Sequence, residues 1–214
     1  HDLGMMAHRI FLTATAPRKV HAEPKGDILF PEVTVLMGDP TLPDTVKKNG
    51  QFNPEDLETI DKLKDALGEL HGYSFKFVSH HNSLVQELKN SPPKFVLNLC
   101  DEGYYNDAFM ELHVPALLEI LGVPYTGAGP ASLGLCYNKS LVRAVAEGVD
   151  IPVPLETYFD PDDTAATLPS SFPALCKPNF GDSSIGITKD AVVHNPSELV
   201  AYLKKLRDDF PGRP

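Results

Sequence analysis

The 214-residue sequence has no tryptophan, only three cysteines, and no apolar run of the roughly 20 residues that cross a bilayer. Its first residues do not form a signal-peptide pattern. Basic residues are in deficit, because 19 Lys and Arg stand against 29 Asp and Glu, a formal net charge of −10. These absences argue against a membrane protein and against a nucleic-acid or anionic-membrane partner. A local basic site for a nucleotide is still compatible with this charge.

The cysteines Cys100, Cys136 and Cys176 are an odd number, and each lies in or beside an apolar run. This placement predicts reduced, buried thiols in a cytoplasmic protein. Cys100 follows an apolar run, where a nucleophile could stand, but no histidine is near it in the sequence. A structural thiol is therefore the expected role.

Several ligand-binding motifs are also missing. No Walker-type GxxxxGK[ST] element occurs. Residues 127–132 only approach a GxGxxG dinucleotide fingerprint, because the sixth residue is serine and no acidic residue follows at the usual distance. His80 and His81 on an extended segment would point to opposite sides, so they form a poor metal chelate and are expected to be solvated.

The composition is that of a soluble globular protein, with 42% apolar and 22% charged residues. Its length suffices for one large or two small domains. In the first half, apolar segments alternate with amphipathic ones, the pattern of a parallel sheet with right-handed crossover helices. The predicted strands are residues 33–37, 75–78 and 95–99.

Helix signals separate these strands. Asn53 is a predicted N-cap and Pro54 the first helical residue, and the apolar face extends to Leu70 before Gly72 ends the helix. A shorter helix contains residues 84–88.

Ligands of parallel sheets lie beyond the carboxyl ends of the strands. Here Gly38-Asp39 and residues 100–102 occupy those ends. Tyr104 and Tyr105 follow, and they either line a pocket or pack on the surface.

In the second half, an amphipathic stretch covers residues 108–121, and Pro115 marks either the start of a helix or a kink. A short strand is predicted at 123–126, and Asn138 is a predicted cap of a helix at 139–147. Pro196 opens a last helix, whose apolar face is formed by Leu199, Val200, Leu203 and Leu206.

Residues 172–188 combine a predicted buried strand, 172–176, with Lys177-Pro178 and a glycine- and serine-containing loop, 181–186. Such a loop can wrap phosphate oxygens with its backbone N–H groups, and the lysine would add a positive charge. The alternative is an ordinary turn with a surface lysine before it and Asp182 as a turn residue.

Four features occur in a specific order: residues 115–127 (PALLEILGVPYTG), Asn138-Lys139, Lys177-Pro178 and residues 181–186 (GDSSIG). This set resembles the D-alanine–D-alanine ligase-like proteins of the ATP-grasp superfamily, in which an LG(I/V)PYTG turn, an acidic residue with a lysine, a K-P pair and a GSS(V/I)G loop follow one another. The resemblance extends over residues 33–214.

The resemblance implies an α/β protein whose N-terminal parallel-sheet, Rossmann-like (pre-ATP-grasp) domain precedes an incomplete α+β ATP-grasp domain. Its expected parts are an N-terminal extension (1–30), a substrate domain (31–137) and the first ATP-grasp subdomain (138–214). The implied chemistry uses ATP and Mg²⁺, and it joins a carboxylate to an amine through an acyl phosphate. Amino acids are the implied substrates, and a homodimer is a possible assembly.

The resemblance also implies site residues. Lys139 and Lys177 match the lysines that contact ATP phosphates. The loop serines Ser183 and Ser184 match catalytic positions, the first of which belongs to a hydrogen-bond network that orders the substrate. The loop positions implied to bind the nucleotide are Gly181, Ser183, Ser184 and Gly186.

Departures from the family pattern bear on the substrate. The family's GGx(S)xE and HGxxGEDG elements are replaced by residues 37–41 and 98–103, and Asn138 replaces the usual aspartate. Asp101 or Glu102 could receive a substrate ammonium group, and specificity for D-alanine is not implied.

The chain also ends before the part that carries the family's Mg²⁺ ligands, so the sequence contains no expected metal-binding residue. We therefore expect a fragment or a truncated homologue that does not catalyse ligation by itself. The alternatives are a non-catalytic nucleotide- or amino-acid-binding module and a dinucleotide-dependent oxidoreductase.

Overall fold

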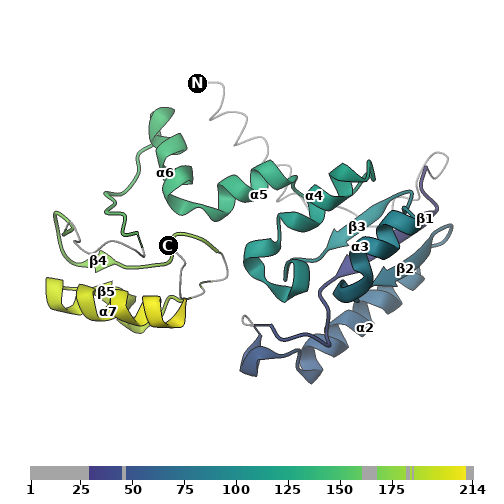
Figure 1. The fold of residues 1–214 in the computed structure, drawn as a ribbon, viewed down its shortest axis with the longest axis horizontal. Coiled ribbons are helices and arrows are strands. Elements are labelled where there is room, and N and C mark those ends of the chain that lie inside the picture. The colour runs from purple at the N-terminus through teal and green to yellow at the C-terminus, as the bar shows by residue number, and fades with distance from the viewer. Residues whose placement is uncertain (1–28, 45–46, 161–167, 182–183, 185, 211–214) are drawn as a thin grey trace.

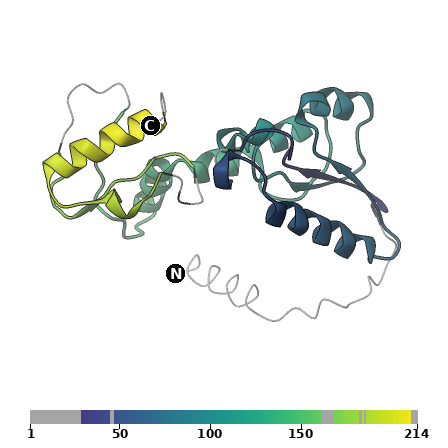
Figure 2. The same ribbon diagram turned by 90° about the horizontal axis from the view of Figure 1, so that it is seen from below.

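The computed structural model describes residues 29–44, 47–160, 168–181, 184 and 186–210 (Figures 1 and 2). None of the helices in these ranges is long and apolar enough to cross a membrane. The elements, in chain order, are β1 (Glu32–Met37), η1 (Lys48–Gly50), α2 (Pro54–Gly68), β2 (Ser74–Val78), α3 (His81–Asn90), β3 (Val96–Leu99), η2 (Tyr104–Asn106), η3 (Ala108–Met110), α4 (His113–Ile120), α5 (Pro130–Tyr137), α6 (Lys139–Gly148), β4 (Ala174–Leu175), η4 (Lys189–Ala191), β5 (Val192–Val193) and α7 (Pro196–Asp209).

The first half forms the predicted parallel sheet, in the order β2-β1-β3. The predicted strand at 123–126 is reduced to a single parallel bridge between Val96 and Tyr125. Because side chains alternate between the faces of a strand, the sheet buries apolar residues on both sides. Helix α2 covers one face and helices α3 and α4 cover the other, as Figure 2 shows.

Helix α2 starts as predicted, since Asn53 accepts hydrogen bonds from the backbone N–H groups of Glu55 and Asp56 and completes a capping box. The helix ends at Gly68, earlier than predicted. Leu70 therefore lies outside it and is 49% exposed. The apolar pattern in the sequence continues to Leu70, but the side chains of α2 that pack against the sheet end at Leu67.

Helix α4 begins at His113, so Pro115 lies in its first turn and no kink is needed. The N–H that proline lacks would have no intrahelical partner there.

The second half contains a two-stranded antiparallel sheet, β4-β5, that packs against α7. The predicted buried strand at 172–176 is reduced to Ala174–Leu175, and Leu175 is mostly exposed. On α7, Leu199 is buried but Val200 is 60% exposed, so the predicted apolar face is narrower than expected. The small sheet covers one side of the helix and the helix covers one face of the sheet, so Val200 and Leu175 both remain exposed.

The cysteines differ from the prediction of buried thiols. Cys100 is buried and Cys176 is half-buried, but Cys136 on α5 is exposed. Burial raises the pKa of the Cys100 thiol to about 12, and the carboxylates of Glu102 and Asp101 add to that shift. Burial likewise raises the pKa of Cys176 to about 11. Both thiols are thus protonated at neutral pH, which fits the structural role predicted for Cys100.

Candidate functional site

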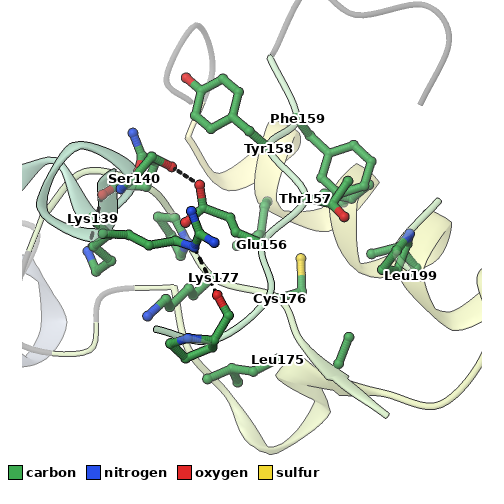
Figure 3. Close-up of a pocket in the computed structure, with 18 of the residues that line it drawn as sticks. Lys139, Ser140, Glu156, Thr157, Tyr158, Phe159, Leu175, Cys176, Lys177 and Leu199 are labelled. Atoms are coloured by element: carbon green, nitrogen blue, oxygen red, sulfur yellow. Dashed lines mark hydrogen bonds between the residues drawn. The ribbon is translucent and has the colours of Figure 1, made fainter. Parts of the chain in front are cut away.

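A cavity of about 630 Å³ lies between α6, β4, α7 and the segment 154–160. Lys139 from the start of α6 and Lys177 from the residues after β4 both line it. Figure 3 shows the two lysines at the end of the cavity opposite Leu199. The structure therefore brings together two cations that lie 38 positions apart in the sequence (177 − 139).

The start of α6 is tied to the chain just before the glycine loop. Asn138 caps the helix by accepting from the N–H of Leu141. Asn179 is buried, its side-chain oxygen accepts from the N–H of Ser140 at 2.9 Å, and its amide donates to the side-chain oxygen of Asn138 at 3.1 Å. The start of helix α6 and Asn179, two residues before the loop, are thus held together, a contact that sequence reasoning did not foresee.

Lys139 belongs to the same arrangement. Its ammonium group donates to the carbonyl oxygen of Gly181 at 2.6 Å and to that of Asn179 at 3.4 Å. The positive charge of Lys139 is therefore held beside the first residue of the glycine loop.

Lys177 is exposed, and no hydrogen bond or ion pair within the described ranges engages its ammonium group. It is thus available to an anion that enters the cavity.

Within the glycine loop the structure describes Gly181, Ser184 and Gly186, and Ser183 lies outside the described residues together with Asp182 and Ile185. Gly186 has a φ of +71°, and a Cβ there would come within 2.7 Å of Phe210 and 2.9 Å of Pro178. Both the dihedral angle and the contacts require glycine at this position. Ser184 also adopts a left-handed conformation, with a φ of 60°.

The rim of the cavity has polar residues that the sequence did not single out. The hydroxyl of Ser140 donates to a carboxylate oxygen of Glu156 at 2.6 Å (Figure 3). Arg143 donates to the carbonyl oxygen of Pro154 and forms an ion pair with Glu147. Helix α6 thereby holds the 154–156 segment, although no local sequence pattern marks that contact.

The two acidic candidates at the end of β3 lie in different surroundings. Glu102 packs against Gly38, where a Cβ would come within 2.6 Å of its carboxylate, and forms an ion pair with Lys47 at 3.1 Å. Burial and the neighbouring Asp101 raise the pKa of Glu102, and the hydrogen bond from Lys47 opposes that shift. Asp101 is exposed and lines a second cavity of about 300 Å³ with Asn98, Glu111 and Gly127.

His81 contradicts the expectation that both histidines of the pair are solvated. His80 is exposed, but His81 is 1% exposed and contacts β1, the end of β3 and η2. The prediction assumed an extended segment, whereas His81 is the first residue of α3. Its buried neighbour Asp39 accepts from the hydroxyl and N–H of Thr41 and from the N–H of His81.

The pKa of Asp39 is lowered, because these hydrogen bonds outweigh the effect of burial. Asp39 is therefore ionised, and its carboxylate is already hydrogen-bonded to Thr41 and His81.

No group of three or more His, Cys, Asp or Glu residues in the described ranges could hold a metal ion. Mg²⁺ prefers oxygen ligands and is usually bound by one or two carboxylates together with substrate phosphates. Two carboxylates among the described side chains line the larger cavity, those of Glu156 and Asp160, and Glu156 accepts a hydrogen bond from Ser140. The described residues at this cavity therefore include no cluster of three such ligands.

Comparisons with known proteins point to one group of enzymes, although no protein-family model matches the chain. The D-alanine–D-alanine ligase of Oleidesulfovibrio alaskensis is 38% identical over 126 residues, which cover 54% of this chain and 40% of the ligase. That of Alkalilimnicola ehrlichii is 27% identical over 178 residues, which cover 82% of this chain and 47% of the ligase.

Crystal structures of D-alanine–D-alanine ligase from Bacillus anthracis share the fold. One matches with a TM-score of 0.57 and 20% identity, covering 82% of this chain and 53% of that chain. Another, complexed with ATP, matches with a TM-score of 0.54 and 21% identity, covering 83% of this chain and 55% of that chain. The chain thus spans about half the length of these relatives.

Proposed function

We propose that the chain is part of a D-alanine–D-alanine ligase-like protein of the ATP-grasp superfamily, and that the complete protein is an ATP-dependent carboxylate–amine ligase. The observation that carries the proposal is the larger cavity, which Lys139 and Lys177 line together beside the start of a glycine loop. Two cations and backbone N–H groups are the groups that bind a nucleotide's phosphates.

In the proposed reaction, a substrate carboxylate attacks the γ-phosphorus of ATP and ADP leaves, which yields an acyl phosphate. An amine then attacks the acyl carbon, inorganic phosphate leaves, and the amine loses a proton as the amide forms. The protein's contribution is mainly the placement of reactants and the neutralisation of charge. We assign that neutralisation to Lys139 and Lys177.

The loop residues Gly181, Ser183, Ser184 and Gly186 are proposed to close over the phosphates, with the two serines ordering the reacting groups. The left-handed backbone at Ser184 and Gly186 supports a tight turn there. Mg²⁺, when bound, would neutralise phosphate charge.

For the amino-acid substrate, we propose that Asp101 receives the ammonium group. Glu102 was the other candidate, but its carboxylate already pairs with Lys47. Asp101 is exposed and lines a cavity of its own, so its charge is accessible to a ligand.

The test is ADP release by the complete gene product with Mg-ATP and a panel of D- and L-amino acids. We expect release that requires a particular amino acid, and a loss of about 100-fold or more in Lys139→Ala and Lys177→Ala. Lys62→Ala is the matched control, because Lys62 is an exposed lysine on α2.

Full activity in Lys177→Ala would contradict the assignment of phosphate binding. ATP binding without ADP release for any amino acid would instead favour the non-catalytic binding module. The 214-residue chain alone is expected to release no ADP, and amino-acid-dependent release by it would refute that expectation.

A further inference from the structure

His81 is a buried histidine that the proposed reaction does not use. The other histidines in the described ranges, His71, His80, His113 and His194, are all exposed. Burying an imidazole removes it from water, so each ring nitrogen needs a partner.

Both nitrogens of His81 have backbone partners, and these determine its protonation. Nδ1 lies 2.8 Å from the N–H of Tyr105, which can only donate, so Nδ1 carries no proton. Nε2 lies 3.0 Å from the carbonyl oxygen of Met37, which can only accept, so Nε2 carries the proton. The geometry therefore requires a neutral imidazole in one tautomer.

The groups around the ring favour this neutral form. Burial lowers the pKa of His81, while the hydrogen bond to Met37 and the carboxylate of Asp39 oppose the shift without reversing it. The other titratable groups that face the ring are the Cys100 thiol, 3.7 Å from Nε2, and the phenols of Tyr104 and Tyr105, whose rings contact it.

The segment held by His81 has an unusual backbone. Tyr105 and Asn106 have φ angles of 59° and 55°, a left-handed conformation that is unfavourable for residues other than glycine. Two contacts stabilise it: His81 accepts from the N–H of Tyr105, and Asn106 exchanges hydrogen bonds with the backbone of Asp39.

The same segment begins at the smaller cavity. Asp101 lines the smaller cavity. In the sequence it stands between Cys100 and Tyr105, and both of these residues contact His81. Further along the chain, Phe109 lines the larger cavity, and its ring lies 6.4 Å from that of Phe180, next to the glycine loop. Phe109 lies outside residues 101–107, so the position of this segment bears on the smaller cavity.

We propose that His81, in its neutral form, is a positioning residue for the amino-acid substrate: it holds residues 101–107 in the conformation that presents Asp101. The inference rests on the proposed ligase function and on the ammonium role of Asp101. Protonation of Nδ1 would place an N–H against the N–H of Tyr105 and break the contact. Acid should therefore weaken amino-acid binding, at a pH below that at which an ordinary histidine is protonated.

The protonation state can be tested by NMR of the complete protein with ¹⁵N-labelled histidine. The His81 signals, assigned by their loss in His81→Asn, should show the Nε2–H tautomer. They should become charged only below the reference histidine pKa of about 6.5. A proton on Nδ1 in the neutral form, or a midpoint of protonation above that value, would overturn the proposal.

The positioning role is tested by kinetics of the complete protein. His81→Leu removes both ring contacts and should raise the KM for the amino acid by about tenfold, since a buried donor is left unsatisfied. The KM for ATP should change by less than about twofold, within ordinary surface-substitution effects. His81→Asn keeps an acceptor for the N–H of Tyr105 and should recover part of the affinity.

His80→Leu is the matched control, because His80 is the exposed neighbour. An unchanged amino-acid KM in folded His81→Leu, with ADP release intact, would refute the positioning role alone. No amino-acid-dependent ADP release in the unmodified protein would refute the ligase function, and the positioning role with it. If His81→Leu does not fold, the amino-acid KM of the unmodified protein is measured over the pH range in which NMR shows His81 gaining its second proton. A KM that stays constant while His81 becomes charged contradicts the proposal.

Discussion

Gly103 shows how much one residue can determine at the carboxyl end of β3. It has a φ of +83°, and a Cβ at this position would lie 2.1 Å from the carbonyl oxygen of Asp107. Backbone atoms cannot move aside as a flexible side chain can. The turn that directs residues 101–107 back toward β1 is therefore compatible only with glycine.

We expect Gly103→Ala to lower the free energy of unfolding by about 2–5 kcal/mol, from the left-handed conformation and the overpacking together. Urea denaturation measures this change. Gly68→Ala is the control, because Gly68 has open space around it at the end of α2 and should be neutral or stabilising by up to about 1 kcal/mol. Equal effects of the two substitutions would contradict the role assigned to Gly103.

At the scale of elements, helix α2 depends on its first turn. Asn53 accepts hydrogen bonds from two backbone N–H groups, and the side chain of Asp56 accepts from the N–H of Asn53. These contacts satisfy donors that no helical carbonyl can reach. The helix covers one face of the sheet, so its start affects the packing of that face.

Asn53→Ala should destabilise the protein by about 1 kcal/mol, the usual cost of removing an N-cap acceptor. Asn53→Asp keeps the acceptor and adds a negative charge near the positive end of the helix dipole, so it should retain the stability. Thermal or urea unfolding of the two variants tests this difference. A loss in Asn53→Asp as large as that in Asn53→Ala would exclude the capping contact as the cause.

At the scale of the whole molecule, the buried apolar residues form separate groups. Two of them lie on opposite faces of the parallel sheet, and a third packs α7 against β4-β5. Within the described ranges, no buried residue belongs to both the sheet groups and the α7 group. Cooperative unfolding follows contiguous packing, so the two halves should unfold as distinct units.

Calorimetry should therefore resolve two transitions. Leu118→Ala and Leu199→Ala remove buried side chains from different units. Each should lower the free energy of unfolding of its own unit by about 2–5 kcal/mol and so shift only one of the two transitions. The controls are Ile120→Ala and Val200→Ala, exposed positions on the same two helices, which should change stability by less than about 0.5 kcal/mol. A single transition shifted by both core substitutions would show that the halves unfold together.

Much of the fold could be predicted because its signals are local. The strands β1, β2 and β3 are short apolar runs, and the starts of α2, α6 and α7 carry Asn–Pro or Asn caps that act within four residues. The parallel arrangement follows from the alternation of these elements. Predictions of burial were less accurate, as Leu70, Val200, Cys136 and His81 show, because burial depends on which distant segment covers a side chain.

The sequence by itself determined the family resemblance, the parallel sheet and the two lysines, since each depends on residue types and their order along the chain. Only the tertiary structure decided that Lys139 contacts the carbonyl oxygen of Gly181, that Glu102 pairs with Lys47, and that His81 is buried and neutral. Each of these contacts joins residues at least 24 positions apart. No local pattern encodes such a contact, because it forms only when packing brings the two segments together.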